Sequence, residues 1–187
     1  MRIIGGDMKG RRIETPKGRD IRPTSDRARE AVFNLLMNGK PAVDIKGKVV
    51  VDVFAGTGAL GLEAMSRGAE HVVFVDNSMV SLACLEANTI GLGVFSRSSI
   101  ISADARYLAR PPSVASAGAD LLFVDPPYHQ DLVVPCLKRL ADTGWIGENG
   151  LVVAEMESNA QFECPLDFGV VDSRTYGAAK IVFLYRV

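Results

Sequence analysis

The spacing of hydrophobic residues predicts a parallel sheet whose strands alternate with helices. Short apolar runs are typical of strands buried on both faces, and they recur near residues 48–53, 71–75, 98–102 and 119–124. The pattern between and after these runs predicts helices near residues 59–67, 78–90 and 131–141. Three further strands, of which the last two can form a hairpin, are expected near residues 151–156, 170–175 and 180–185. The expected fold class is therefore a doubly wound α/β sheet.

The first 41 residues follow a different pattern, which predicts a short β-hairpin and then a helix. Two strand-like segments flank the glycine-rich turn Gly5–Gly10. Thr24 or Ser25 can cap the helix that follows. One apolar stripe along this helix is formed by Ala28, Ala31, Val32, Leu35 and Leu36. We expect one domain over residues 1–187, in which residues 1–41 extend a core at 42–187.

Composition favours a compact enzyme without a metal. At 48% hydrophobic and 23% charged residues, a chain of 187 residues can bury a core of its own. No apolar run approaches the roughly 18 residues that span a bilayer, and the start lacks a secretory signal, so we expect a cytoplasmic protein. We also expect it to be a monomer. The three cysteines have no CxxC spacing and only two histidines accompany them, so we expect reduced thiols and no metal site. These residues are Cys84, Cys136, Cys164, His71 and His129.

The most informative stretch is Asp125-Pro126-Pro127-Tyr128, which follows the apolar run 121–124. Proline has a fixed φ and no N–H group, so the carbonyls of this turn are rigid acceptors without neighbouring donors. Asp125 and the Pro126 carbonyl could accept both hydrogens of a planar exocyclic amine while Tyr128 stacks on its ring. Taken alone, the tetrapeptide is equally compatible with a proline turn that merely ends a strand.

A glycine turn lies upstream of this motif, in the run Asp52–Gly61. Gly56 and Gly58 would let the backbone approach a ligand at a helix start, and Gly61 would let the helix pack tightly. The spacing matches the G-x-G-x-x-G fingerprint, and Asp76 follows the next strand, where an acid could hold a ribose diol. On this pattern alone, a dinucleotide-dependent oxidoreductase is possible.

Charge at this turn favours a cationic ligand over a dinucleotide. A pyrophosphate seated there would face Asp52, a like charge that costs about 1 kcal/mol or more at close range. S-adenosylmethionine (SAM) instead carries a sulfonium and an ammonium, and its ribose could bind Asp76. Asp104 follows the next expected strand and could reach the adenine amino group. Each acid alone could be a solvated strand end or a helix cap, but three in succession favour a pocket.

Further sequence blocks accompany these two motifs: Arg2–Gly6, Arg22–Arg27, Arg29-Glu30, Phe33-Asn34 and Gly144-Trp145. In this order and spacing, the chain resembles the RsmD-type 16S ribosomal RNA guanine-N2 methyltransferases over essentially its whole length. The N-terminal block is the most particular part, because other amino-directed methyltransferases share the Asp-Pro-Pro-Tyr motif. The resemblance implies a Rossmann-like SAM-dependent methyltransferase sheet of seven strands with an antiparallel edge.

The resemblance also implies roles for individual residues. It implies that SAM is held by Asp52, Phe54, Gly56, Gly58, Asp76, Asp104 and Ala105. It implies catalysis at Asp125–Tyr128, on the exocyclic N2 of one guanine in 16S rRNA, the guanine 966 type of activity. The family often has Glu where this chain has Asp76, so the reach of this acid differs. The partner expected is 16S rRNA within an assembled or partly assembled small ribosomal subunit.

Charge is distributed unevenly and supports a nucleic-acid substrate. Residues 1–30 hold nine Arg and Lys against five acids, a net of +4, although the whole chain has a net charge of −1. A basic arm on an acidic body is typical of phosphate contact, and an ordinary solvated segment is the alternative. Among the residues expected to bind the RNA substrate, Lys9, Arg11 and Arg12 are predicted to contact phosphates, whereas Arg22 and Arg27, which flank Thr24, are predicted to face the pocket.

Three other functions compete with this interpretation. A DNA adenine-N6 methyltransferase shares the chemistry but usually needs a target-recognition region. An oxidoreductase leaves Asp125–Tyr128 without a role, and a non-catalytic RNA-binding protein does not explain two aligned motifs. Adenine, cytosine and a protein glutamine also offer planar amino groups, so guanine follows from the family resemblance alone.

Overall fold

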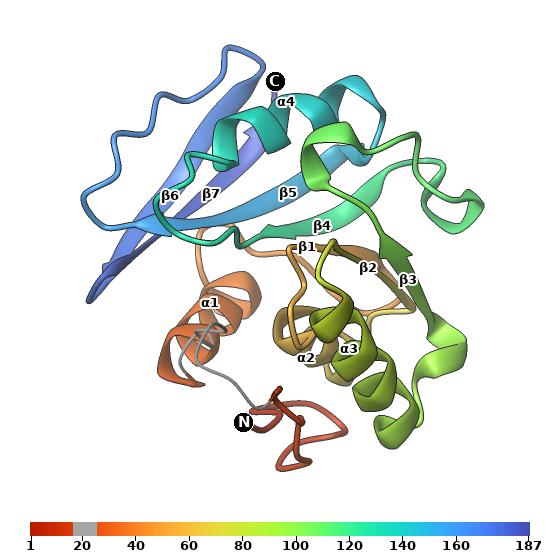
Figure 1. The fold of residues 1–187 in the computed structure, drawn as a ribbon. Helices are drawn as coiled ribbons and strands as arrows, with labels where there is room; N and C mark the ends of the chain where they lie inside the picture. Colours follow the sequence, from red (N-terminus) through yellow and green to blue (C-terminus); the bar gives the residue numbers. More distant parts are fainter. Residues whose placement is uncertain (17–25) are drawn as a thin grey trace.

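A central sheet with helices on both faces forms the fold (Figure 1). The computed structural model describes residues 1–16 and 26–187, so the expected cap at Thr24 or Ser25 lies outside the described residues. The helices are α1 (Asp26–Asn38), α2 (Ala59–Ser66), α3 (Met79–Leu92) and α4 (Val133–Asp142). Short 3₁₀ turns are η1 (Phe95–Arg97), η2 (Ala105–Tyr107) and η3 (Ser113–Ala115). The strands are β1 (Val49–Val53), β2 (His71–Asp76), β3 (Ser98–Ser102), β4 (Ala119–Val124), β5 (Ile146–Glu157), β6 (Phe168–Tyr176) and β7 (Ala179–Arg186).

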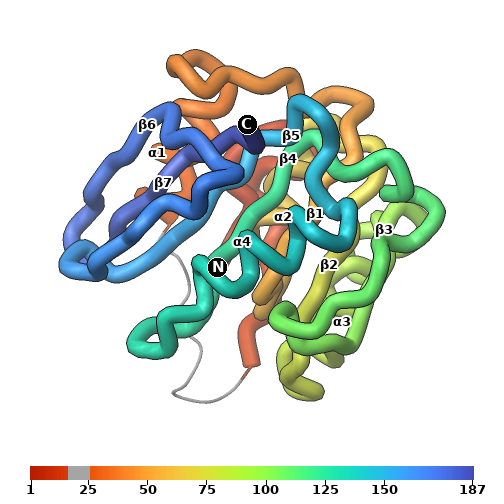
Figure 2. The backbone as a smooth tube through the Cα atoms, turned by 90° about the horizontal axis from the view of Figure 1, so that it is seen from above, coloured from red at the N-terminus to blue at the C-terminus, as the bar shows by residue number. Residues whose placement is uncertain are grey.

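The described residues form a seven-stranded sheet in the order β3-β2-β1-β4-β5-β7-β6. Strands β1 to β5 pair in parallel, and β7 runs antiparallel between β5 and β6. In the view from above, β6 and β7 extend beyond α4 at one side of the sheet (Figure 2). The doubly wound sheet with an antiparallel edge is confirmed. Because β1 to β5 are parallel, their carboxyl ends all lie on one edge.

Alternate residues of the central strands point to opposite faces of the sheet and so belong to two separate hydrophobic cores. One core joins Phe74 and Phe123 to α1, α2 and α3, and the other joins Val75 and Val124 to α4 and η2. The strands carry apolar residues at consecutive positions because both of their faces are covered. Within the described ranges, no helix is long and apolar enough to cross a membrane.

The N-terminal segment forms the expected hairpin in a minimal version. An antiparallel bridge joins Arg2 to Arg12, and the Ile3 N–H donates to the Arg11 carbonyl at 2.9 Å. The hairpin is fastened to α2 by a carboxylate that the sequence analysis did not single out, Glu63.

Glu63 is a fully buried acid that several donors surround. Its carboxylate accepts hydrogen bonds from the backbone N–H groups of Ile4 and Gly5 and from the Arg67 side chain, each at 2.8 Å. The Nε of Arg29, another fully buried side chain, lies 4.0 Å from the same carboxylate. A buried charge is tolerated only when it is paired and hydrogen-bonded, so Glu63 ties the hairpin and α1 to α2.

Replacing this acid should destabilise the whole domain. We expect Glu63→Gln to lower the free energy of unfolding by about 3 kcal/mol, because the largely buried Arg67 loses its ion pair and the buried Arg29 loses Glu63 and keeps Asp26. Glu86→Gln, on the exposed face of α3, is the matched control. Urea denaturation measures both variants, and equal midpoints would refute the role of Glu63.

Candidate active site

The two sequence motifs meet at the carboxyl edge of the sheet. Strands β1 and β4 are neighbours, with Val53 opposite Val124, and the Asp125 N–H donates to the Val53 carbonyl at 3.3 Å. The glycine turn after β1 therefore lies beside the Asp125–Tyr128 loop after β4. In an open parallel sheet, this edge is where ligands bind.

The glycines of the turn serve different purposes. Positive φ values occur at Gly56 (56°) and Gly58 (80°), and also at Phe54 (63°), which is not a glycine. A Cβ added at Gly56 would meet only the Phe54 carbonyl oxygen, 4.0 Å away, so this backbone is open to a ligand. A Cβ at Gly58 would instead overlap Leu85 of α3. Gly58 is therefore needed both for its left-handed backbone and for the close packing of α3. From the sequence, close packing was predicted for Gly61 alone.

Asp76 braces this turn from the neighbouring strand. One carboxylate oxygen accepts the Gly56 N–H and the other accepts the Ser78 N–H, both at 2.8 Å. The acid is half-buried at the end of β2. It is therefore held beside the open backbone of Gly56, and its contact with a ribose diol stays a prediction.

Asp52 points into the fold and not toward open solvent. It is 1% exposed and accepts the Gly61 N–H at 2.8 Å, at the start of α2. Burial raises the pKa of Asp52 well above its ordinary value, the Gly61 donor opposes this, and the carboxyl groups of Asp125 and Asp76 raise the pKa further. The charged form of the Asp52 carboxyl group is therefore disfavoured. Asp52 would repel a pyrophosphate less strongly than the sequence indicated.

Asp104 has a strong partner that the sequence analysis did not consider. Its carboxylate accepts the Arg106 backbone N–H at 2.9 Å and forms an ion pair with the Arg106 guanidinium at 2.6 Å. These hydrogen bonds lower the pKa of Asp104. The Ala103 N–H bonds the Asp76 carbonyl, so Asp104 and the buried Ala105 lie next to the Asp76 strand end. An adenine amino group would have to share the acid with Arg106.

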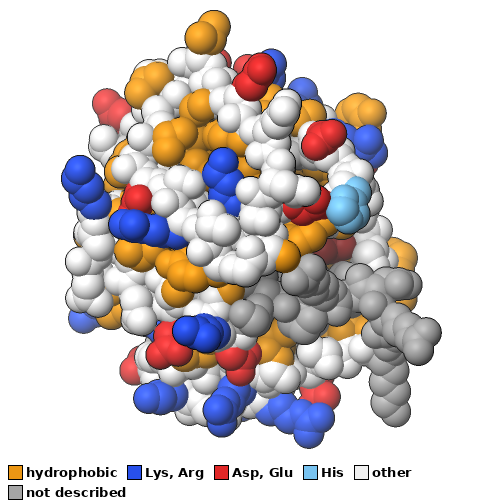
Figure 3. All heavy atoms as spheres, turned by 90° about the vertical axis from the view of Figure 1, so that its left-hand side faces the viewer, with side chains coloured by type: hydrophobic (Ala, Val, Ile, Leu, Met, Phe, Trp, Pro, Cys, Tyr) orange, Lys and Arg blue, Asp and Glu red, His pale blue; other side chains and the backbone are white. Residues whose placement is uncertain are grey.

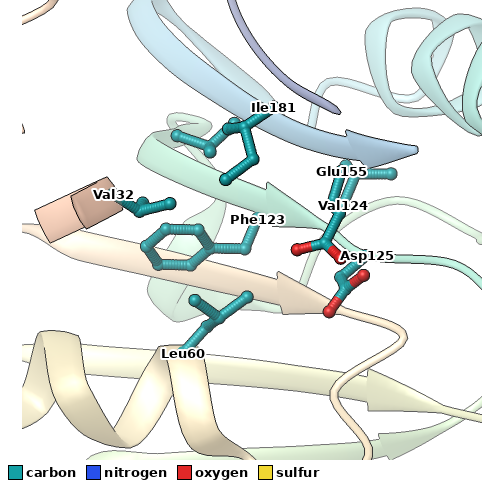
Figure 4. A pocket seen from close by; sticks show the side chains of 8 residues that line it. Val32, Leu60, Phe123, Val124, Asp125, Glu155 and Ile181 are labelled. Carbon is teal, nitrogen blue, oxygen red and sulfur yellow. The ribbon is translucent and has the colours of Figure 1, made fainter. Parts of the chain in front are cut away.

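The loop after β4 is held by two acids that sequence reasoning missed. The Tyr128 hydroxyl donates to Glu155, and the His129 N–H donates to Glu157, each at 2.8 Å. Figure 4 shows the carboxyl groups of Asp125 and Glu155 close together at the ends of neighbouring strands. The available signal was the alternation of two acids after the apolar run of β5, which places both on one face.

The predicted RNA contacts differ in their surroundings. The Arg11 guanidinium donates to the carbonyls of Gly91 and Leu92, at 2.6 and 3.1 Å, and so completes the end of α3. Lys9 and Arg12 are exposed on the hairpin, and their contact with RNA stays a prediction. Arg27 is exposed in the first turn of α1, whereas Arg22 and Thr24 lie outside the described residues.

The cysteines and the possible metal ligands are dispersed over the described residues. Across residues 1–16 and 26–187, no group of three or more His, Cys, Asp or Glu side chains could hold a metal ion. Cys84, Cys136 and Cys164 are free thiols, and burial raises the pKa of Cys136 to about 12.

A sheet of this order, with an open glycine turn after β1 and an Asp-Pro-Pro-Tyr loop after β4, defines a Rossmann-like methyltransferase. The chain belongs to the family described as Conserved hypothetical protein 95, which matches residues 1–185, and it is an RsmD-type methyltransferase. The family resemblance read from the sequence is confirmed, and the oxidoreductase alternative is set aside.

Individual relatives are similar to this chain over most of their lengths. Ribosomal RNA small subunit methyltransferase D of Escherichia coli K12 is 34% identical over 157 residues, 84% of this chain and 75% of that protein. YlbH of Bacillus subtilis is 32% identical over 182 residues, 97% of this chain and 96% of that protein. Among solved structures, Escherichia coli yhhF aligns with a TM-score of 0.81 at 30% identity, over 100% of this chain and 97% of that one.

The two glycines of the turn should respond differently to alanine. We expect Gly56→Ala to cost about 1–2 kcal/mol of stability, from the left-handed backbone alone, and to weaken SAM binding strongly because the methyl group enters the open side. Gly58→Ala should cost clearly more stability, since it adds the overlap with Leu85. Thermal denaturation and calorimetric SAM binding measure both effects, and equal destabilisation by the two variants would contradict this assignment.

Proposed function

We propose that the protein transfers a methyl group from SAM to the exocyclic N2 of a specific guanine in 16S rRNA. The observation that carries this proposal is the adjacency of the open backbone at Gly56 and the loop Asp125–Tyr128 on neighbouring strands. The names of the relatives, which specify small-subunit rRNA, support the choice of nucleic acid. Guanine 966 is the position proposed from the family resemblance.

The residues of the turn fit SAM. The Gly56 backbone leaves room for the cofactor, and Asp76 would accept the ribose hydroxyls next to it. Asp104 and Ala105 would border the adenine, and Asp52 would support the turn from below. When bound, SAM supplies an electrophilic methyl group on a sulfonium.

The loop after β4 would position the acceptor base. The target guanine must leave its stack to reach this edge. Asp125 and the Pro126 carbonyl would accept the two hydrogens of its amine, which turns the nitrogen lone pair toward the methyl group. Pro127 keeps the turn rigid, and Tyr128 would stack on the base with its ring fixed by the hydroxyl bond to Glu155.

Bond formation needs no covalent enzyme intermediate. The amine could displace the methyl group from the sulfonium directly, which would leave a neutral thioether, and Asp125 or water would then accept the surplus amine proton. Asp125 would stabilise the positive charge that develops on nitrogen. We expect the substrate to be 16S rRNA in an assembled or partly assembled small subunit, and the enzyme to act in the cytoplasm as a monomer.

Nucleoside analysis tests this proposal directly. Small ribosomal subunits from cells lacking the enzyme are incubated with the purified protein and labelled SAM, and their nucleosides are then separated. We expect the label in N2-methylguanosine, and in a single oligonucleotide when the same rRNA is instead cut by a base-specific nuclease. Label in N6-methyladenosine, or transfer to duplex DNA in place of ribosomal RNA, would refute it.

Cofactor binding and turnover should separate on mutation. We expect Asp76→Ala to weaken SAM binding, because the variant removes both the diol acceptor and the brace of Gly56. Asp125→Ala should leave SAM affinity almost unchanged but remove most of kcat. Calorimetry and single-turnover methylation distinguish the two, and normal turnover by Asp125→Ala at saturating substrate would show the assigned chemistry to be wrong.

The basic hairpin should likewise divide into two roles. We expect the double variant Lys9→Ala and Arg12→Ala to weaken subunit binding and to flatten its salt dependence, because fewer counterions are released. Arg11→Ala should instead lower stability, since the end of α3 loses two hydrogen bonds. Binding measured between 50 and 200 mM salt, roughly the range where phosphate contacts are resolved, tests the first effect. A double variant with the wild-type salt slope would remove the phosphate role.

A further inference from the structure

Val32, Phe123, Asp125 and Glu155 line one pocket, which we call the Asp125 pocket (Figure 4). A second pocket lies on the same side of the sheet. It has a volume of about 520 Å³ and lies between the first turns of α1 and the hairpin turn that joins β6 to β7. Pockets for small organic ligands typically measure about 300–1,000 Å³. The residues that line it are Arg27, Ala28, Ala31, Thr175, Tyr176 and Gly177.

Small residues of α1 and of the hairpin turn border the pocket, and Tyr176 also lines it. Ala28 and Ala31 come from consecutive turns of α1, and Gly177 occupies the hairpin turn with φ of 60°. Tyr176 is half-buried and packs against the core below α1. Arg27 is exposed and brings a positive charge. The pocket is therefore lined by an aromatic residue and a cation, which are the two kinds of side chain that proteins use to bind single-stranded nucleic acid.

The topology brings this pocket next to the catalytic loop. The hairpin turn pairs with the end of β5, where Glu157 lies opposite Ala179. The same Glu157 binds His129, which directly follows Tyr128. Along α1, Val32 lines the Asp125 pocket one helical turn after Ala28. The two pockets are therefore neighbours along one helix and one edge of the sheet.

We propose that this second pocket binds the nucleotide that adjoins the target guanine in the RNA. Its base stacks on Tyr176, and Arg27 contacts a phosphate of the same strand. A flipped target base carries its neighbours with it, so a second platform beside the first would hold the strand in the splayed conformation. This inference rests on the proposed function and adds a subsite that reads the shape of the extruded strand. Figure 3 shows apolar patches between Lys and Arg side chains on the side of the molecule that carries β6 and β7.

Two variants with a control for each test the pocket. We expect Tyr176→Ala to raise the KM for small subunits on the order of tenfold, as for the loss of one base-stacking contact, and Tyr176→Phe to behave like wild type. Ala31→Leu should have a similar effect by filling the space, whereas Glu30→Leu, at the adjacent exposed position of α1, should not. SAM affinity and the urea midpoint of Tyr176→Phe and Ala31→Leu should match wild type.

A modified RNA identifies the occupant. Small subunits are reassembled with 16S rRNA that carries an abasic residue on the 5′ or the 3′ side of the target guanine. Wild type should lose about tenfold in kcat/KM on one of these substrates, and Tyr176→Ala should lose nothing further on it. Equal factors for Tyr176→Ala on intact and abasic RNA, or wild-type activity of Ala31→Leu, would overturn this inference alone. Absence of guanine methylation by wild type on intact subunits would overturn the proposed function together with it.

Discussion

The buried carboxylate of Glu63 is the interaction on which the arrangement of this molecule depends. It joins the backbone of the N-terminal hairpin at Ile4 and Gly5 to the side chains of Arg67 and Arg29. Because α2 begins at the glycine turn and α1 lines the Asp125 pocket, one acid links the two halves of the site. Burial lowers the pKa of Arg29, and the charges of Asp26 and Glu63 oppose this shift. The network is stable only when complete, so the hairpin belongs to the fold as well as to any contact with RNA.

The candidate site has two halves: one is formed mainly by the backbone of the glycine turn, and the other by side chains on and around the loop after β4. The half proposed to bind the cofactor depends on positive φ values at Phe54 and Gly56, and Asp76 accepts a hydrogen bond from the Gly56 N–H. The half proposed to bind the substrate depends on acids from β5 that hold the loop after β4 and fix the hydroxyl of Tyr128.

The elements and their order could be predicted because each has a local cause. Consecutive apolar residues in β1 and β4 require cover on both faces, and Gly56 and Gly58 require a left-handed turn. The two motifs could be located because parallel strands bring their carboxyl ends to one edge. The roles of Gly58 and Arg11 were predicted only in part, because Leu85, against which Gly58 packs, and Gly91, whose carbonyl accepts a hydrogen bond from Arg11, lie far away along the chain.

Sequence patterns were sufficient to predict the fold class, the family and the sheet edge on which both motifs lie. These follow from periodicity and from motifs whose residues are contiguous. Only the tertiary structure decided the burial of Asp52, the brace from Glu155 to Tyr128 and the pocket beside Tyr176. The physical reason is that solvation and hydrogen-bond partners depend on which distant segments meet, and residue spacing along one chain carries no such information.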